Sequence, residues 1–305
     1  MPKLLIVKMH GANTVDERQM VSPVLVENFR RDGFVVVPNL LGEDELAKFG
    51  AAVDRAVRDR GRNDHRKLEE KSPYEQSFTQ CINLWEDHPD VLPLTFHPKI
   101  SQTAAMLIGV PVLRLWHDQA LYKDSGGRYT EPHQDQPYWP MDETQTLSAW
   151  VPFDGSTHET GCMGYVPGSH RAGLRKFVNI FTADEKVKIL EDPAIAGISP
   201  VYVEVARGSV AFHHGLTVHL AKPNRSKRAR RVHTMIYFRD GATRTKPYVH
   251  PSVDRPGIKV GEVIQSDLTP IVWPRAAGDF PKPPRMPLTP VLERLNIHGA
   301  LPEIK

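Results

Sequence analysis

Residues 131–137 place an imidazole and a carboxylate two positions apart, at His133 and Asp135. Positions i and i+2 of a β-strand point to the same face, so on a strand these side chains would grip one ion from the same side. Imidazole and carboxylate ligands suit a divalent iron, and one further histidine would complete a facial triad with open coordination positions. The chain has 14 histidines, so the pair alone is a weak signal.

The third ligand is expected from a second segment. Residues 212–219 form a β-rich run that ends in His219, and a Pro-Asn turn then reverses the chain. This placement predicts that His219 completes the triad. His213 and His214, which precede it by six and five residues, are the alternative third ligands.

Arg230 lies eleven residues after His219, where the next apolar run begins. A hairpin of that length would bring its guanidinium beside the metal. A guanidinium is a planar fork of donors that matches a carboxylate through two hydrogen bonds, so Arg230 is a candidate for holding a dicarboxylate cosubstrate. The alternative is that Arg230 is one more solvated charge in the basic run 225–231. That run is itself either a solvated turn or a phosphate-binding patch.

Short β-rich runs must position these side chains. Turn signals such as residues 125–127 and 167–168 separate the runs, and many short strands with regular punctuation are typical of a barrel or jelly roll. The predicted strands are 112–122, 146–153, 163–166, 201–205, 209–213 and 231–238.

The chain before these strands is expected to be mainly helical. Leu46, Phe49, Val53 and Val57 recur at helical spacing and form one apolar stripe. We expect helices at 26–32, 43–58 and 99–108, a buried strand at 34–37, a charged loop at 59–80 and a helical insertion at 182–191.

These elements predict one domain over residues 1–240, with a helical buttress at 24–110 and a jelly-roll core at 111–240. Residues 1–22 are expected to be a tail or edge strand. Residues 241–305 hold eleven of the 27 prolines, and proline is excluded from helix interiors and central strands. We expect this C-terminal extension to pack on the core in extended form or to be partly disordered.

Composition restricts the environment and the partners. The formal net charge of +3 over 305 residues is too small to indicate nucleic-acid binding. No stretch approaches the roughly 18 apolar residues of a membrane helix, and the first ten residues lack the apolar run of a signal peptide. Cys81 and Cys162 do not indicate a disulfide framework. We therefore expect a cytoplasmic monomer or homodimer that acts on a small molecule and binds neither nucleic acid nor membranes.

Several motifs, taken in order, together resemble one family. They are residues 32–37, 115–123, His133-Gln134-Asp135, 161–170, and His219 through Asn224 and Ser226 to Arg230. Over roughly residues 24–240 the chain resembles the phytanoyl-CoA dioxygenase family of iron(II)/2-oxoglutarate oxygenases. The resemblance implies a double-stranded β-helix, the cupin-like jelly roll, with helices packed on one sheet.

The resemblance also implies roles for individual residues. It implies that His133, Asp135 and His219 bind Fe(II), and that Arg230 pairs with the C5 carboxylate of 2-oxoglutarate. Dioxygen would be the second cosubstrate. Further cosubstrate contacts are implied for Gln119, Trp150, Lys123 and Gln134.

One position departs from the family pattern. The family often has a small hydroxyl residue two positions after the distal histidine, where this chain has Ala221. That hydrogen bond is either missing here or supplied from elsewhere, with Tyr122 and Thr234 as candidates. Tyr138 and Trp139 closely follow the His-x-Asp pair and are candidates for lining the substrate pocket, although they fit a core position equally well.

The activity implied is oxidation, by hydroxylation first of all, of an unactivated C–H bond in a small molecule, with succinate and carbon dioxide as co-products. Asp135 favours hydroxylation over halogenation, because iron halogenases of this type replace the carboxylate ligand by a small residue. Two other interpretations stay open: a hydrolase or isomerase that uses zinc or manganese on the same triad, and a non-catalytic binding module. Arg230 separates them, because a hydrolase needs no clamp for a dicarboxylate.

Overall fold

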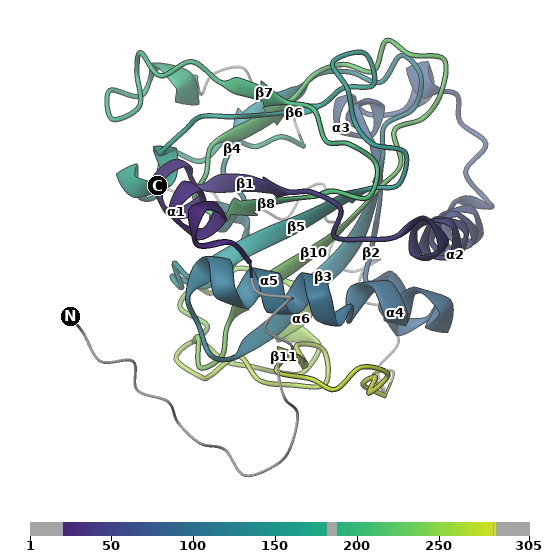
Figure 1. The fold of residues 1–305 in the computed structure, drawn as a ribbon. Coiled ribbons are helices and arrows are strands. Elements are labelled where there is room, and N and C mark those ends of the chain that lie inside the picture. Colours follow the sequence, from purple (N-terminus) through teal and green to yellow (C-terminus); the bar gives the residue numbers. More distant parts are fainter. Residues whose placement is uncertain (1–20, 182–187, 283, 285–305) are drawn as a thin grey trace.

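The computed structural model describes residues 21–181, 188–282 and 284. Two antiparallel β-sheets face one another, and helices cover the outer side of the larger sheet (Figure 1). The arrangement is a jelly roll, which confirms the mainly β class with flanking helices. The expected tail or edge strand at 1–22 falls almost wholly outside the described residues.

The strands divide unequally between the two sheets. The larger sheet has the order β1 (Phe34–Val37), β8 (Val210–His214), β5 (Thr146–Pro152), β10 (Val232–Arg239), β3 (Leu113–Tyr122) and β11 (Ile271–Trp273), with β2 (Thr79–Ile82) also paired to β3. The smaller sheet has the order β4 (Thr130–His133), β9 (His219–Ala221), β6 (Met163–Tyr165) and β7 (Val201–Val203).

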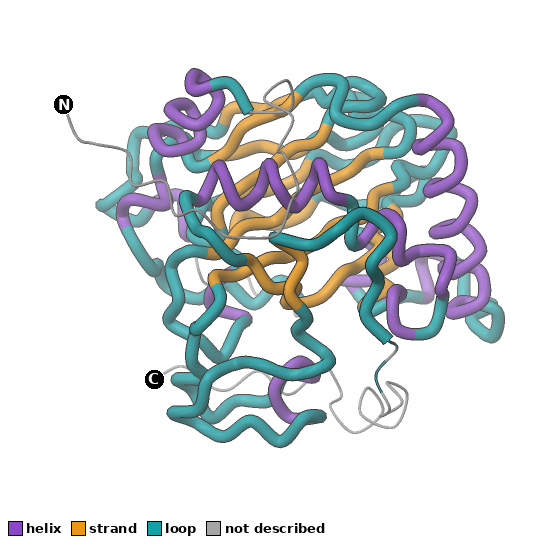
Figure 2. Tube along the Cα trace, turned by 60° about the horizontal axis from the view of Figure 1, so that its bottom comes forward, coloured by secondary structure: helices purple, strands orange, loops and turns teal. Residues whose placement is uncertain are grey.

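Helix α5 (Pro98–Ile108) contacts β5 and β11 of the larger sheet, and Figure 2 shows it running across the strands. The α-helices of the described chain are α1 (Pro23–Asp32), α2 (Glu43–Gly61), α3 (Pro73–Ser77), α4 (Leu92–Thr95), α5 (Pro98–Ile108) and α6 (Pro251–Asp254). Short 3-10 turns are η2 (Leu68–Glu70), η3 (Leu84–Glu86), η4 (Pro89–Val91), η5 (Gln136–Tyr138), η6 (Ser169–Ala172) and η7 (Ile189–Glu191).

The main hydrophobic core lies between the helices and the larger sheet. Leu46 and Val53 from the predicted stripe of α2 are buried there, with Ile100 of α5 and Leu115 of β3. Successive side chains of a strand point to opposite faces, so the other face of the larger sheet looks toward the smaller one. The space between the two sheets is where the candidate ligands meet.

Strand β3 changes face in the middle. Neighbouring residues Ile236 and Tyr237 of β10 pair with His117 and Leu115, so Trp116 is one extra residue on β3. Such a β-bulge re-aims the side chains beyond it. Leu113 and Leu115 therefore point into the helical core, whereas residues 117, 119 and 121 point between the sheets.

Residues 59–80 are not the charged loop that we expected. They include α3 and the start of β2, which pairs with β3 through Thr79↔Tyr122 and Gln80↔Leu121. Ser72 begins α3 with a capping box: its hydroxyl accepts from Glu75 N at 3.3 Å, and Glu75 Oε2 accepts from Ser72 N at 2.9 Å. A Ser-Pro-x-Glu signal was therefore present in the sequence, hidden among the surrounding charges.

The expected insertion at 182–191 lies largely outside the described residues. Its described part, 188–191, contains the single turn η7 rather than a helix. Helix α1 begins at Pro23, three residues earlier than predicted, because proline is favoured at the first helical position.

Residues 241–282 pack on the β core. Ala242, Val253 and Ile258 are buried against Trp116 and Phe238. Further along, β11 adds an antiparallel strand beside β3. The described part of the C-terminal extension therefore closes one side of the space between the sheets.

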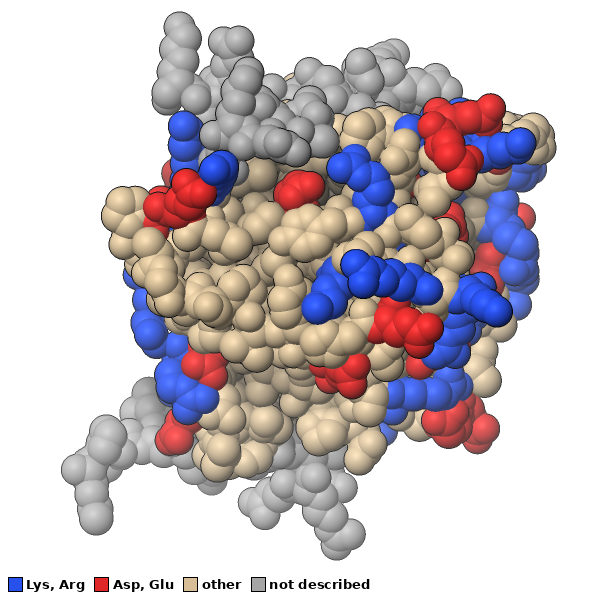
Figure 3. Space-filling model, turned by 90° about the horizontal axis from the view of Figure 1, so that it is seen from above, with Lys and Arg blue, Asp and Glu red and all other residues tan. Residues whose placement is uncertain are grey.

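Basic and acidic side chains lie intermixed on the face seen in Figure 3. Arg231 of the basic run pairs with Asp54 at 2.6 Å and with Asp154 at 2.8 Å. Cys81 and Cys162 are buried and unpaired. In the described ranges, no helix combines the length and apolar character needed to cross a membrane.

Candidate metal centre

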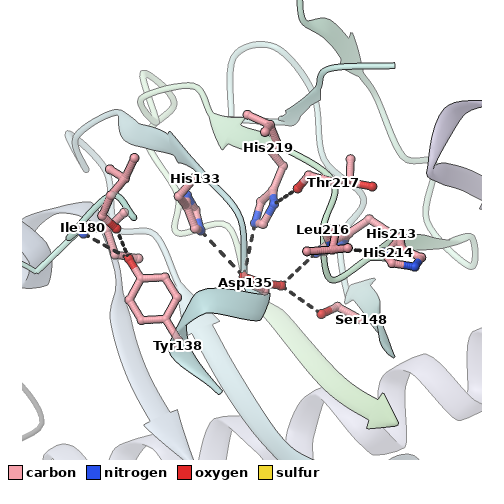
Figure 4. A network of polar contacts seen from close by, with 12 residues as sticks. His133, Asp135, Tyr138, Ser148, Ile180, His213, His214, Leu216, Thr217 and His219 are labelled. Atoms are coloured by element: carbon pink, nitrogen blue, oxygen red, sulfur yellow. Dashed lines mark hydrogen bonds and ion pairs between the residues drawn. The ribbon is translucent and has the colours of Figure 1, made fainter. Parts of the chain in front are cut away.

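His133 and His219 are direct cross-strand partners in the smaller sheet, on β4 and β9. Their ring centroids lie 4.2 Å apart. Asp135 Oδ1 lies 3.7 Å from Nε2 of His133 and 3.5 Å from Nε2 of His219 (Figure 4). One ligand atom from each residue lies within 4.8 Å of the other two, a spacing that one metal ion can bridge.

Backbone carbonyls fix the tautomers of both histidines. Nδ1 of His133 lies 2.7 Å from the carbonyl oxygen of Glu131, and Nδ1 of His219 lies 3.0 Å from that of Thr217. A carbonyl only accepts, so Nδ1 carries the proton and Nε2 keeps its lone pair for a metal. Burial lowers the pKa of His133, and burial next to His133 lowers the pKa of His219 to about 3, so both rings stay neutral.

Asp135 is held as a carboxylate. Burial alone would raise its pKa, but the neighbouring His219 and His213 outweigh burial, and the pKa lies far below its usual range. Its second oxygen, Oδ2, accepts from the Ser148 hydroxyl at 3.1 Å and lies 3.2 Å from Nε2 of His213. These contacts turn Oδ1 toward His133 and His219.

Asp135 does not lie on a strand, so the prediction that one strand face presents both His133 and Asp135 was wrong. Its backbone is helical, with φ −77° and ψ −37°, at the start of η5. The N–H groups of Asp135 and Gln136 both donate to the carbonyl of Gly215, at 3.1 and 3.0 Å. These two bonds turn the chain after His133, and the turn brings the carboxylate back toward the imidazoles.

The alternative ligands His213 and His214 lie elsewhere. His213 contacts Oδ2 of Asp135, the oxygen that faces away from the other two imidazoles. Nδ1 of His214 accepts from the backbone N–H of Leu216 at 3.0 Å. The metal-spaced group that the described residues form therefore contains His219.

Arg230 does not face His219 across a hairpin. Strands β9 and β10 belong to different sheets, and Arg230 instead pairs with Lys123 beside β3. The expectation of a hairpin was wrong because the turn after His219 carries the chain from one sheet to the other. Arg230 nevertheless lines the same cavity as His219.

The guanidinium of Arg230 is 3% exposed and has spare donors. Nη1 donates to the carbonyl of Gly161, and the guanidinium carbon lies 5.1 Å from the centre of the Trp150 ring. Nε is buried without a partner among the described residues. Burial lowers the pKa of Arg230 to about 10. A buried cation without a counter-charge is costly, so the site suits an anionic ligand such as a carboxylate.

One row of the larger sheet lies beside Arg230. Thr234 is paired with Trp150 on one side and with Gln119 on the other, and all three line the cavity. The Thr234 hydroxyl is buried and has no hydrogen-bond partner in the part of the chain that the structure describes. Tyr122, the other candidate to replace the hydroxyl missing at Ala221, donates its hydroxyl to Asp54 at 2.6 Å, on the helical side of the sheet. Thr234 is therefore the candidate that the fold places at the cavity.

Two predicted contacts are not brought to the cavity lining. Lys123 is fully buried, and its Nζ donates to the Arg128 carbonyl and to the Thr130 hydroxyl. Burial and the neighbouring Arg230 lower its pKa to about 6. Gln134 donates to the carbonyl of Leu216 at 2.7 Å, with its other bonds to the loop near residue 173.

Tyr138 and Trp139 both line the cavity, and they also pack in a hydrophobic cluster. Tyr138 OH accepts from the backbone N–H of Ile180 at 3.2 Å, as Figure 4 shows. The sequence interpretation missed four lining residues that matter below: Gln80, His117, Phe181 and His250. Gln80 lay in the supposed loop, and His117 reaches the cavity only through the bulge at Trp116.

Comparisons with known proteins agree with this geometry. The model of the family described as phytanoyl-CoA dioxygenase matches residues 29–232. A phytanoyl-CoA dioxygenase domain-containing protein 1 homolog of Caenorhabditis briggsae is 24% identical over 264 residues, which are 69% of this chain and 88% of the relative. The corresponding Mus musculus protein is 22% identical over 283 residues, with 77% and 97% covered.

Solved structures extend the likeness to the fold. The α-ketoglutarate-dependent carbocyclase SnoK from nogalamycin biosynthesis has a TM-score of 0.71 at 30% identity, covering 86% of this chain and 99% of its own. The epimerase SnoN, solved with Fe3+, α-ketoglutarate and nogalamycin RO, has a TM-score of 0.66 at 26% identity, covering 82% and 97%.

Proposed function

This chain belongs to the phytanoyl-CoA dioxygenase family of 2-oxoglutarate-dependent oxygenases, and we propose that it hydroxylates an unactivated C–H bond of a small molecule. In this proposal His133, Asp135 and His219 hold Fe(II), and Arg230 binds the C5 carboxylate of 2-oxoglutarate. Succinate and carbon dioxide are the co-products.

One observation carries the proposal: the metal-spaced triad shares its cavity with a buried arginine that has no counter-charge among the described residues. A hydrolase or isomerase built on the same triad has no need of such a cation. A binding module that took up neither metal nor anion would leave Arg230 buried and uncompensated.

The residues present suit the iron and the cosubstrate. Three protein ligands would leave coordination positions open for 2-oxoglutarate and dioxygen. When bound, the iron supplies dioxygen activation coupled to oxidative decarboxylation of 2-oxoglutarate. The chain positions the reactants and excludes water.

Separate residues of the larger sheet orient the cosubstrate in this proposal. Arg230 offers its remaining donors to the distal carboxylate, and the Thr234 hydroxyl, which no described residue engages, offers one more hydrogen bond. Trp150 covers the guanidinium and keeps water from it. Gln119, held by Gln80 at 2.6 Å, lies one strand further along the same row.

The choice of hydroxylation rests on Asp135, because a carboxylate at this position occupies the place that a halogenase leaves for chloride. Two structural relatives carry out carbocyclisation and epimerisation by their names. Hydroxylation is distinguished from these outcomes by product mass: a gain of one oxygen atom, a loss of two hydrogen atoms, or no change.

The test is a substrate screen with iron-loaded protein that follows succinate formation and analyses product masses. Anaerobic titration with 2-oxoglutarate is run on the same preparation. A wild-type protein that binds iron but not 2-oxoglutarate would contradict the proposal and favour a hydrolase or isomerase.

A further inference from the structure

One part of the cavity is lined by residues of β2 and β3, by Ile180 and Phe181, and by residues 249–251 of the C-terminal extension. We call this part the substrate chamber. Among the described residues that line the whole cavity, only Asp135 and Arg230 carry a formal charge. Both have roles in the proposed iron and cosubstrate sites. A charged group of a ligand in the chamber would therefore lose its water without meeting an opposite charge.

One wall of the chamber is aromatic. The Tyr74 and Phe181 rings lie 4.3 Å apart, and Tyr138 lies 5.8 Å from Phe181. Tyr74 donates its hydroxyl to Gln80 Oε1 at 2.6 Å, and Gln80 then donates to Gln119. Because these polar atoms bond to one another, the wall presents ring faces, which pack best against flat apolar or aromatic groups.

The lining of the chamber also includes two neutral imidazoles. The rings of His117 and His250 lie 5.7 Å apart and nearly parallel, and His250 stacks on Trp116 at 4.3 Å. Burial lowers the pKa of His117 to about 4 and that of His250 well below its usual value. Both rings are therefore uncharged at neutral pH.

Hydrogen bonds at Nδ1 give the two rings opposite hydrogen-bonding roles at Nε2. Nδ1 of His117 lies 3.3 Å from the carbonyl oxygen of Asp118, so this nitrogen donates and Nε2 is left as an acceptor. Nδ1 of His250 accepts from the backbone N–H of Ser252 at 3.2 Å, so Nε2 carries the proton and is left as a donor. The chamber thus offers one acceptor and one donor side by side, and a hydroxyl group satisfies both.

We infer that the substrate chamber takes an uncharged aromatic ligand whose hydroxyl group hydrogen-bonds between His117 and His250. The inference rests on the proposed function, because the ligand would be the molecule that is oxidised. It assigns a phenol-like substrate class and excludes acyl-CoA thioesters, amino acids and phosphonates from the chamber.

Three matched probes test the inference on the iron- and 2-oxoglutarate-loaded protein, held without oxygen: 1-naphthol, naphthalene and 1-naphthoate. Two hydrogen bonds are expected to make 1-naphthol bind about tenfold tighter than naphthalene. The 1-naphthoate anion is expected to bind at least about tenfold more weakly than 1-naphthol. Equal affinity for 1-naphthoate and 1-naphthol, or no binding of any probe, would overturn the inference.

Two variants locate the hydroxyl. His117→Phe and His250→Phe should each lower 1-naphthol affinity toward that of naphthalene and leave naphthalene binding within about twofold. The double variant should lose little more, because both imidazoles bind one group. His158→Phe, at an exposed histidine outside the cavity, is the matched control. Unchanged 1-naphthol affinity in both folded single variants would also overturn the inference.

A separate measurement keeps the two proposals apart. 2-Oxoglutarate binding is recorded for every variant and is expected to equal that of the wild type. If the wild-type protein does not bind 2-oxoglutarate, the proposed function is contradicted. The relative affinities of the three probes report on the chamber alone.

Discussion

The guanidinium carbon of Arg230 lies 5.1 Å from the centre of the Trp150 ring, on the neighbouring strand of the larger sheet. A cation over an indole face is favoured electrostatically, and more so when both are out of water. The ring therefore stabilises a buried charge that no described carboxylate neutralises. The pair is arranged to receive an anion.

Arg230→Ala should weaken 2-oxoglutarate binding by roughly ten- to a hundredfold, because a charge-assisted contact contributes about 1.5–3 kcal/mol. Arg230→Lys should fall between wild type and Arg230→Ala, since it keeps the charge and loses the fork. The measurement is anaerobic 2-oxoglutarate affinity, with iron content determined in parallel and expected to be unchanged. Arg231→Ala is the control, because Arg231 pairs with Asp54 and Asp154 instead. Wild-type affinity in Arg230→Ala would place the clamp elsewhere.

His219→Ala should abolish stoichiometric iron binding and turnover while the fold is kept. His213→Phe should retain one iron per chain but bind it about ten- to a hundredfold more weakly, since His213 orients Asp135 without reaching the ligand position. Metal analysis after dialysis against a graded chelator series measures both. Full iron occupancy in His219→Ala together with loss of iron in His213→Phe would show that His213 is the ligand and His219 is not.

Thr234→Val keeps the shape of the side chain and removes the hydroxyl that has no partner in the cavity. The loss of one hydrogen bond to an anion should reduce 2-oxoglutarate affinity by about tenfold. Tyr122→Phe removes a hydroxyl on the helical side of the same sheet and should leave that affinity unchanged. If the two variants behave alike, Thr234 does not contact the cosubstrate.

Lys123 should make the free energy of unfolding depend on pH. Burial lowers its pKa to about 6 in the folded chain, while the unfolded chain keeps the usual value of 10.5. Between these values the unfolded state binds one more proton, so stability rises with pH, by up to about 1.4 kcal/mol per unit. Denaturant unfolding near pH 7 and pH 8 should show this slope, and Lys123→Met should reduce it. An unchanged slope in Lys123→Met would show that other groups cause the dependence.

The sequence was sufficient for features that depend on local pattern. The apolar stripe of α2 follows from the short-range spacing rule of helix geometry. The β-rich runs were predicted to within a few residues because each is punctuated by turn residues. The short strands that carry the two histidines, β4 and β9, were not among the predicted strands, and the run expected to end in His219 is divided between β8 and β9.

Features that depend on which strands pair could not be read from spacing. The spacing of eleven positions from His219 to Arg230 is compatible with a hairpin, and only the full topology shows that this segment crosses between sheets. Asp135 approaches the histidines through a turn held by the distant Gly215, which no pattern near residue 135 reveals. His250 reaches the chamber from an extension whose prolines indicated only that it is irregular.

The extra residue at Trp116 means that β3 can lose one residue at this position without changing which side chains face the cavity. Without Trp116, Leu115 and His117 would be adjacent and would pair with Tyr237 and Ile236 in unbroken register. Strict alternation would then leave Leu115 toward the helices and keep His117, Gln119 and Leu121 toward the space between the sheets. The indole that stacks on His250 and packs on Phe238 would be lost. A one-codon deletion here would therefore weaken the packing of the C-terminal extension on the core and leave the metal ligands and the rest of the sheet in register.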